Sequence, residues 1–291
     1  MGGITLRTLD QQLLTGERAL FKSRELVITN SVFADGESPL KESRDISIHH
    51  SIFKWKYPLW YSEHIHVENS TFLEMARSGI WYTRDISIHD SIIDAPKALR
   101  RSSGIRLVNV NLPNAQETLW NCEGVCLEHV TAHGDYFGMN SQNIEIDDLT
   151  LVGNYAFDGA KNIEIRNAKL ISKDAFWNCE NVTVYDSLII GEYLGWNSKN
   201  ITFINCTIES NQGMCYMDHL VIKQGKLIHT DLAFEYSTID VDTATKIDSV
   251  KNPMAGRIKA KDIGELILDD EDIPAANTRY ELEQAGEPCE L

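Results

Sequence analysis

The stretch NIEIDDLTL at residues 143–151 recurs as NIEIRNAKL at 162–170, NVTVYDSLI at 181–189 and NITFINCTI at 200–208. The four copies begin at positions 143, 162, 181 and 200, so the step between them is constant, and apolar and polar residues alternate along the first half of each. Alternation puts successive side chains on opposite faces of an extended chain, so each copy predicts a β-strand. A strand that recurs at a constant step indicates a solenoid built from similar coils.

The same element can be followed outward from this stretch along most of the chain. The element occurs twelve times, and we call the first apolar residue of each copy its start. The step in residue number from one start to the next varies only between 19 and 21. These starts are Leu26, Ile46, Ile65, Ile86, Ile105, Val125, Ile144, Ile163, Val182, Ile201, Leu220 and Ile239. Ile258 fits one further step of 19. The pattern therefore predicts an all-β, single-stranded parallel β-helix of about twelve coils.

Two more apolar columns accompany the starts, one at the seventh position after each start and one at the sixth position before it. Three inward-facing segments per repeat predict a three-sided coil, and neighbouring coils should stack about 4.8 Å apart, the ordinary strand spacing. The uneven steps between neighbouring starts and the right-handed preference of parallel crossovers favour a right-handed helix.

Two polar columns mark the corners of the coil. The residue before each start and the fourth residue after it are mostly Asn, Asp or Gly, as at Asn143, Asn162, Asn181 and Asn200. These residues tolerate left-handed backbone, which lets a strand bend sharply. We interpret both columns, and the serines beside the second, as scaffold.

The repeat fades at both ends of the chain. We predict that residues 1–22 cap the first coil, and that residues 259–291 form a C-terminal cap and a solvated tail containing the acidic run 269–272. No linker-like stretch interrupts the repeat, so residues 1–291 are predicted to be one domain.

Composition argues against several classes of partner. The net charge is −16, from 43 acidic and 27 basic residues, which disfavours binding to nucleic acid or to an anionic membrane. No apolar stretch approaches the roughly 20 residues that span a bilayer, and Met1–Thr5 does not resemble a signal peptide. The six cysteines form no CxxC pair, so we expect a reducing, cytoplasmic location.

Three features carry a resemblance to known proteins. They are the repeat, short units such as Ser43-Arg44-Asp45-Ile46-Ser47-Ile48, and the ending Gly256-Arg257-Ile258 … Ile263-Gly264-Glu265. In these features the chain resembles the pectin-lyase-like superfamily of right-handed β-helices. More closely, the chain is similar to an uncharacterised bacterial family of that fold, known only as a domain of unknown function. The resemblance covers nearly the whole chain. If the chain is an enzyme, the resemblance implies a polysaccharide lyase or glycoside hydrolase. The Gly-His-Gly motif of polygalacturonases is absent, and their Asp-Asp and Arg-Ile-Lys motifs find only coincidental matches here.

An aromatic column is the feature that the repeat does not explain. Five of the six tryptophans lie at the fifth position before a start, where alternation points the side chain outward, and several tyrosines lie three positions earlier. Contiguous exposed aromatic rings mark binding surfaces. The predicted binding residues are Trp60, Trp81, Arg100, Trp120, Tyr136, Tyr155, Trp177, Tyr193 and Trp196.

Two interpretations of this face remain open. Flat aromatic rings stack on sugar faces, so the chain could bind or process a carbohydrate. Alternatively, the face could be covered by loops, by the C-terminal tail or by a second copy of the chain, as in a non-catalytic scaffold or homo-oligomer. Asp158, Asp174 and Glu117 share this side and are the candidate acid–base residues. Asp158 and Asp174 would be roughly 11 Å apart, which is long for a glycosidase pair.

His49, Glu68 and His89 form a second outward constellation on three successive coils, with His66 on the same side. Two imidazoles and a carboxylate can ligate zinc or iron. Strand rows about 4.8 Å apart would have to converge on bonds of about 2 Å, so a stacked polar ladder is the simpler interpretation and we expect no cofactor.

Overall fold

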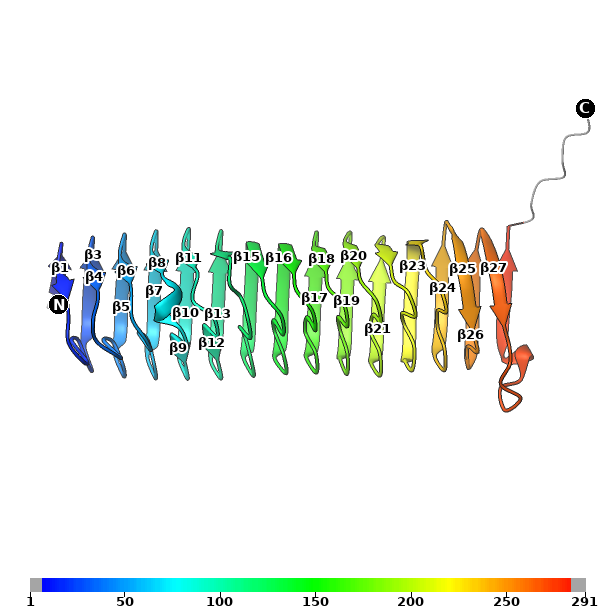
Figure 1. Ribbon diagram of the computed structural model, residues 1–291, viewed down its shortest axis with the longest axis horizontal. Helices are drawn as coiled ribbons and strands as arrows, with labels where there is room; N and C mark the ends of the chain where they lie inside the picture. The colour runs from blue at the N-terminus through cyan, green and yellow to red at the C-terminus, as the bar shows by residue number, and fades with distance from the viewer. Residues whose placement is uncertain (1–6, 284–291) are drawn as a thin grey trace, which may run out of the picture.

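The computed structural model describes residues 7–283, and it shows a rod of about fifteen stacked coils (Figure 1). Residues 1–6 of the predicted N-terminal cap and residues 284–291 of the predicted tail lie outside the described residues. The predicted parallel β-helix of the right-handed type is confirmed. Within residues 7–283, helix is limited to two 3-10 turns, η1 (Glu74–Ala76) and η2 (Ala275–Asn277), so no helix there could cross a membrane.

The first side of the coil carries one strand per coil, and each strand pairs in parallel with its neighbours. These strands are β1 (Arg7–Asp10), β3 (Arg24–Thr29), β5 (Arg44–His49), β7 (Glu63–Glu68), β10 (Arg84–His89), β13 (Ser103–Val108), β15 (Glu123–His133), β16 (Gln142–Val152), β17 (Lys161–Arg166), β19 (Glu180–Tyr185), β21 (Lys199–Ile204), β23 (Asp218–Ile228), β24 (Thr238–Thr243), β26 (Ala255–Ala260) and β28 (Thr278–Leu282).

The second side is built from shorter strands and from the second halves of β15, β16 and β23. The short strands are β2 (Leu13–Leu14), β4 (Val32–Phe33), β6 (Ile52–Phe53), β8 (Thr71–Phe72), β11 (Ile92–Ile93), β14 (Asn111–Leu112), β18 (Lys169–Ile171), β20 (Leu188–Ile190) and β22 (Thr207–Glu209). Near the C-terminal end, β25 (Lys246–Lys251) and β27 (Asp262–Ile267) form a separate parallel pair.

The register follows the predicted columns. Ile144 aligns with Ile163 and Ile163 with Val182, and all twelve predicted starts stack in this way. The starts and the residues two positions later are buried in one continuous core, whereas the residues between them face outward. Alternation therefore determined which residues fill the interior, as strand geometry requires.

The third side differs from the predicted strand. It consists mostly of turns, with short pairing between β9 (Ile80–Trp81) and β12 (Leu99–Arg100). Its inward residues are buried as expected, for example Leu59 and Phe176. However, two further positions per coil have positive φ, such as Tyr57 at 62° and Tyr61 at 56°. Left-handed residues interrupt an extended run, so this side is a stack of turns.

Side-chain ladders hold the predicted corners. Asn162 Nδ2 donates to Asn143 Oδ1 at 3.0 Å, and Asn181 and Asn200 repeat this bond one coil at a time. Along the serine column, the backbone N–H of Ser51 donates to Ser70 Oγ at 3.0 Å. The asparagine ladder is exposed, whereas the serines are buried, so their bonds satisfy backbone groups that water cannot reach. In the second column, Asn205 Nδ2 donates to Asp186 Oδ1 at 2.6 Å. These bonds support the scaffold interpretation of both columns and of the serines.

The coil count is higher than the predicted twelve, because three coils lie in or beside the ranges assigned to the caps. One contains β1 and β2, and the other two contain β26 and β28. Their start positions are occupied by Arg7, Gly256 and Thr278, as the alignment with neighbouring strands shows. Since none of these is a large apolar residue, the sequence signature of the coil is lost there.

The prediction that Ile258 is the start of a further coil is wrong. Ile258 aligns with Val241, two positions beyond the start of that coil, and Gly256 aligns with Ile239. The coil that begins at Ile239 is therefore two residues shorter than the usual repeat, which places its next start at Gly256. Ile258 is nevertheless buried, because the second inward position of a strand faces the core just as the first does.

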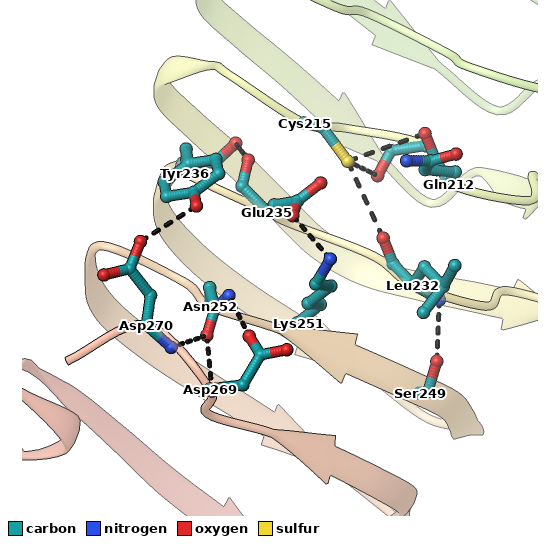
Figure 2. A network of polar contacts seen from close by, with 12 residues as sticks. Gln212, Cys215, Leu232, Glu235, Tyr236, Ser249, Lys251, Asn252, Asp269 and Asp270 are labelled. Atoms are coloured by element: carbon teal, nitrogen blue, oxygen red, sulfur yellow. Dashed lines mark hydrogen bonds and ion pairs between the residues drawn. The ribbon is translucent and has the colours of Figure 1, made fainter. Parts of the chain in front are cut away.

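Polar contacts close the C-terminal end of the third side (Figure 2). Asn252 Nδ2 donates to Asp269 Oδ1 at 2.6 Å, and Asn252 Oδ1 accepts the backbone N–H groups of Asp269 and Asp270 at 3.1 and 3.3 Å. The Tyr236 hydroxyl donates to Asp270 Oδ2 at 2.9 Å. The first half of the predicted solvated run 269–272 is therefore bound to the solenoid.

The register can be tested with two substitutions on β16. Ile146→Ala removes a buried side chain and leaves a cavity, so we expect the free energy of unfolding to fall by about 2–5 kcal/mol. Glu145→Ala changes an exposed neighbour and should cost less than about 0.5 kcal/mol. Urea unfolding followed by circular dichroism measures both, and similar losses in the two variants would contradict the assigned register.

Candidate functional site

The predicted tryptophan column lies on the outer surface of the third side, with every indole half-buried. Trp81 Nε1 donates to the backbone carbonyl of Lys97 at 2.8 Å, and Trp120 Nε1 donates to that of Tyr136 at 2.6 Å. Trp60, Trp177 and Trp196 make the equivalent bond to the next coil. Their N–H groups are therefore already satisfied, and only the ring surfaces remain for an external partner.

The acceptors of these bonds share one backbone feature. Each carbonyl belongs to a residue with positive φ at the first turn of the third side, such as Lys97 at 57° and Tyr136 at 57°. A left-handed corner turns its carbonyl out of the usual ladder between coils. The indole N–H of the preceding coil satisfies that carbonyl, so the tryptophans contribute to the fold as well as to the surface.

Arg100 replaces a tryptophan in the middle of this column. Its guanidinium lies 5.2 Å from the ring centroid of Trp81 and 4.2 Å from that of Trp120, within range of cation–π attraction. Its Nε donates to the carbonyl of Glu117 at 3.2 Å, as an indole would. Together with the parallel rings of Trp60 and Trp81, 5.4 Å apart, this forms a continuous ladder from Trp60 to Trp120.

The ladder is interrupted at the next two coils, where Met139 and Asp158 occupy the tryptophan position. We call this region the ladder break. There the rings of Tyr136 and Tyr155 stack in parallel, 4.7 Å apart and 5° from coplanar. Trp120 lies edge-to-face with Tyr136 at 6.2 Å, and Trp177 lies edge-to-face with Tyr155 at 5.9 Å. Beyond the break, Trp177 and Trp196 resume the ladder at 5.8 Å.

The three candidate carboxylates have different surroundings. Burial alone would raise the pKa of Glu117, but hydrogen bonds and ion pairs with Arg100 and Lys97 outweigh it and lower the pKa below 4.5. Burial raises the pKa of Asp174 above 3.8, and the nearby charges of Glu192 and Asp158 add to the effect, against Lys173 and Tyr155. Glu117 is thus stabilised as a carboxylate by its cationic partners, whereas the protonated form of Asp174 is favoured more than in an ordinary aspartate.

The structure brings some of the predicted site together and leaves the rest apart. Asp158 and Asp174 both lie at the ladder break, close enough for the charge of one to affect the other. Asp174 is buried, however, and does not face outward as its column predicted. Asp158 Oδ1 also accepts a hydrogen bond from Asn178 at 2.9 Å. Glu117 belongs to the intact ladder with Arg100. Tyr193 lies next to Trp196 at 5.4 Å, on the C-terminal side of the break.

The histidine constellation on the first side has a different composition from the predicted one. His49, His66 and Glu68 each offer a ligand atom, and these atoms lie within 4.8 Å of one another. His89 is adjacent, but its Nε2 is 2.6 Å from Ser87 Oγ and it is not one of the three. Burial, with the neighbouring charges of His89 and His49, lowers the pKa of His66 below 6.5. The prediction had centred on one column, and it missed that His66 reaches the group diagonally.

The five cysteines in the described part of the chain are free. Four are buried, and burial raises the pKa of Cys122 and of Cys215 to about 12. A thiol that stays protonated at neutral pH is a poor nucleophile and a poor metal ligand. The four buried cysteines therefore behave as small apolar side chains of the core.

Comparison with solved structures gives only loose likenesses. The surface adhesin PfbA of Streptococcus pneumoniae is 9% identical, with 81% of this chain and 82% of that chain covered at a TM-score of 0.45. The A-module of the mannuronan C-5 epimerase AlgE4 of Azotobacter vinelandii is 10% identical, with 95% and 88% covered at a TM-score of 0.30. Likenesses at this level carry no argument about binding or activity.

No protein with a curated description matches the sequence. Residues 7–281, almost all of the part that the structure describes, do match one family of sequences. The match confirms the predicted resemblance to an uncharacterised family, and it spans every coil of the solenoid. The chain belongs to the family described as "Protein of unknown function (DUF3737)".

Proposed function

We propose that this β-helix is a carbohydrate-binding protein, and that its ligand lies along the third side across the ladder break. The observation that carries the proposal is the half-buried pair of stacked tyrosines, Tyr136 and Tyr155, framed by Trp120 and Trp177. Elsewhere in the column the ring faces are occupied. Trp81, for example, has Trp60 on one face and the Arg100 guanidinium on the other.

Within residues 7–283, each of the two indoles that flank the break is stacked on one face only. Arg100 covers one face of Trp120, and Trp196 covers one face of Trp177. Among the described residues, no aromatic ring stacks on the second face of either indole. Half-buried aromatic surface of this kind supplies much of the energy of a binding site, because it is rigid and already partly dehydrated. The apolar faces of sugar rings match such surfaces.

The polar groups at the break suit hydroxyl groups better than charges. Asp158, which is half-buried, can accept hydrogen bonds from sugar hydroxyls, whereas Asp174 is buried beneath Tyr155 and Lys173 and supports those two side chains from within. Trp120 and Trp177 belong to coils three steps apart, so the break spans roughly 14 Å at the strand spacing. That length fits an oligosaccharide rather than a single sugar. A net charge of −16 disfavours acidic polysaccharides, so a neutral glycan is the proposed class.

The competing function is a protein contact, in which the aromatic face joins two copies of the chain. The satisfied indole N–H groups are compatible with either partner. The interruption of the ladder favours the carbohydrate, because a surface that served only self-association would gain from an unbroken row of rings.

Substitutions at the break should weaken binding of a neutral oligosaccharide. Trp120→Ala and Trp177→Ala each remove a flanking ring, and we expect the Kd to rise at least about tenfold, which corresponds to about 1.4 kcal/mol. A glycan array presenting neutral oligosaccharides identifies the ligand, and isothermal titration calorimetry with that oligosaccharide measures the effect.

Trp81→Ala is the matched control, because it removes an indole with the same backbone hydrogen bond but with both faces occupied. It should leave the Kd within about twofold of the unsubstituted protein. Absence of binding to any neutral glycan would contradict the proposal. So would a stable dimer, measured by light scattering, that becomes monomeric in Trp120→Ala or Trp177→Ala.

The protonation of Asp174 can be tested independently of any ligand. Its pKa is raised in the folded state, so the folded protein binds this proton more tightly and loses stability as pH rises from about 3.8 through the raised value. Asp174→Asn should remove this contribution and raise the Tm at neutral pH relative to the unsubstituted protein. Thermal unfolding between pH 4 and pH 8 measures the difference, and an equal offset at every pH would contradict the assignment.

A further inference from the structure

The first side of the solenoid carries a second constellation, far from the aromatic column. Strands β5, β7 and β10 stack in register, so that His49 lies opposite Glu68 and Ser47 lies opposite His66. The intervening residues are buried in the core, and these four side chains therefore face outward. His49, His66 and Glu68 are all half-buried, which limits their freedom to move apart.

The three donors are already close to the separations of a metal site. His49 Nδ1 lies 3.1 Å from Glu68 Oε2, and one ligand atom from each of the three residues lies within 4.8 Å of the others. Ligands about 2.0–2.2 Å from a tetrahedral zinc ion are about 3.4 Å from one another. Small rotations of the side chains would therefore bring all three donors onto one ion, although their strands are separated by the full strand spacing.

The neighbours of the cluster leave room for an ion. His66 is flanked along its column by Ser47 and Ser87, whose side chains are short. Its ring centroid is 5.6 Å from that of His49 and 5.5 Å from that of His89. The histidine rings are therefore splayed around His66 rather than stacked flat on it, as the interplanar angles of 57° and 48° confirm.

Glu68 differs from most outward carboxylates of this side. Glu63 pairs with Arg44 and Arg84, and Glu128 pairs with Arg106. Within the described residues, the only ion-pair partner of Glu68 is His49. A carboxylate that is not committed to a lysine or an arginine is available to a metal ion, and carboxylates with imidazoles form the ligand sets of zinc and non-haem iron.

We propose that His49, His66 and Glu68 bind one divalent transition-metal ion, with zinc as the reference ion. Three protein ligands leave at least one position open to water, which is the arrangement of reactive rather than purely structural zinc sites. His89 lies beside the site but is held by its contact with Ser87. The proposal does not depend on carbohydrate binding, because no residue of the cluster lies on the third side.

Equilibrium dialysis of the full chain against zinc chloride, after removal of metals with a chelator, tests the proposal. We expect one equivalent of zinc to bind with micromolar or tighter affinity. His66→Ala and Glu68→Gln should each weaken binding at least tenfold. Glu68→Gln keeps the size of the side chain, and circular dichroism of both variants checks that the solenoid remains folded.

Two further variants separate a built site from histidines that bind zinc adventitiously. His89→Gln should retain the affinity within about threefold, because His89 is outside the proposed ligand set. His129→Gln removes a histidine at the corner that follows the first side, which pairs with Asp148 at 2.8 Å, and it should have no effect. Loss of binding in His129→Gln, or unchanged binding in His66→Ala, would overturn the assignment.

Cobalt provides a readout that does not depend on affinity. Co²⁺ bound to the same residues should give visible absorption bands, and zinc should displace it with loss of those bands. The bands should be absent from Glu68→Gln. A spectrum identical to that of aqueous cobalt, together with less than stoichiometric zinc binding, would show that the cluster is a hydrogen-bonded ladder and not a metal site.

Discussion

The whole molecule depends on the parallel hydrogen bonds that lock each coil in register with the next. These bonds fix the alignment of the coils. The nearest neighbour of each side chain in another coil is therefore the residue at the same position of the adjacent coil, about 4.8 Å away. Adjacent residues of a column must therefore either pack favourably as like side chains or carry complementary charges or hydrogen-bonding groups. Phe33 and Phe53 stack at 4.5 Å, whereas Glu63 sits between the cations Arg44 and Arg84.

The same constraint explains how much could be predicted from the sequence. The inward columns and the corners are properties of single coils, repeated often enough that Ile144 or Asn162 could be assigned from its spacing alone. The end coils could not, because Arg7 and Gly256 occupy start positions without an apolar side chain. Their pairing is decided by backbone hydrogen bonds to the neighbouring coil, and the side chains give no sign of it.

The aromatic face shows a second limit of prediction. Its outward direction followed from alternation, but the role of the indole N–H groups did not. Their acceptors are carbonyls of left-handed residues such as Lys97 and Tyr136, and nothing about lysine or tyrosine signals that conformation. Similarly, His66 joins His49 diagonally across the register, so a search along single columns separates residues that the structure brings together. Contacts between columns require the twist and side-chain directions that only the folded coil supplies.

Because the coils stack at a constant spacing, distance along the rod increases by a fixed amount with each coil. His66 lies on β7 and Tyr155 precedes β17, so about five coils, or roughly 24 Å, separate the histidine cluster from the ladder break. Each coil contacts only its neighbours, which means that loss or duplication of one intervening repeat would change this separation by one step and leave both groups of residues intact. Distance along the axis is thus a quantity that related sequences can adjust in whole units, independently of the chemistry at either position.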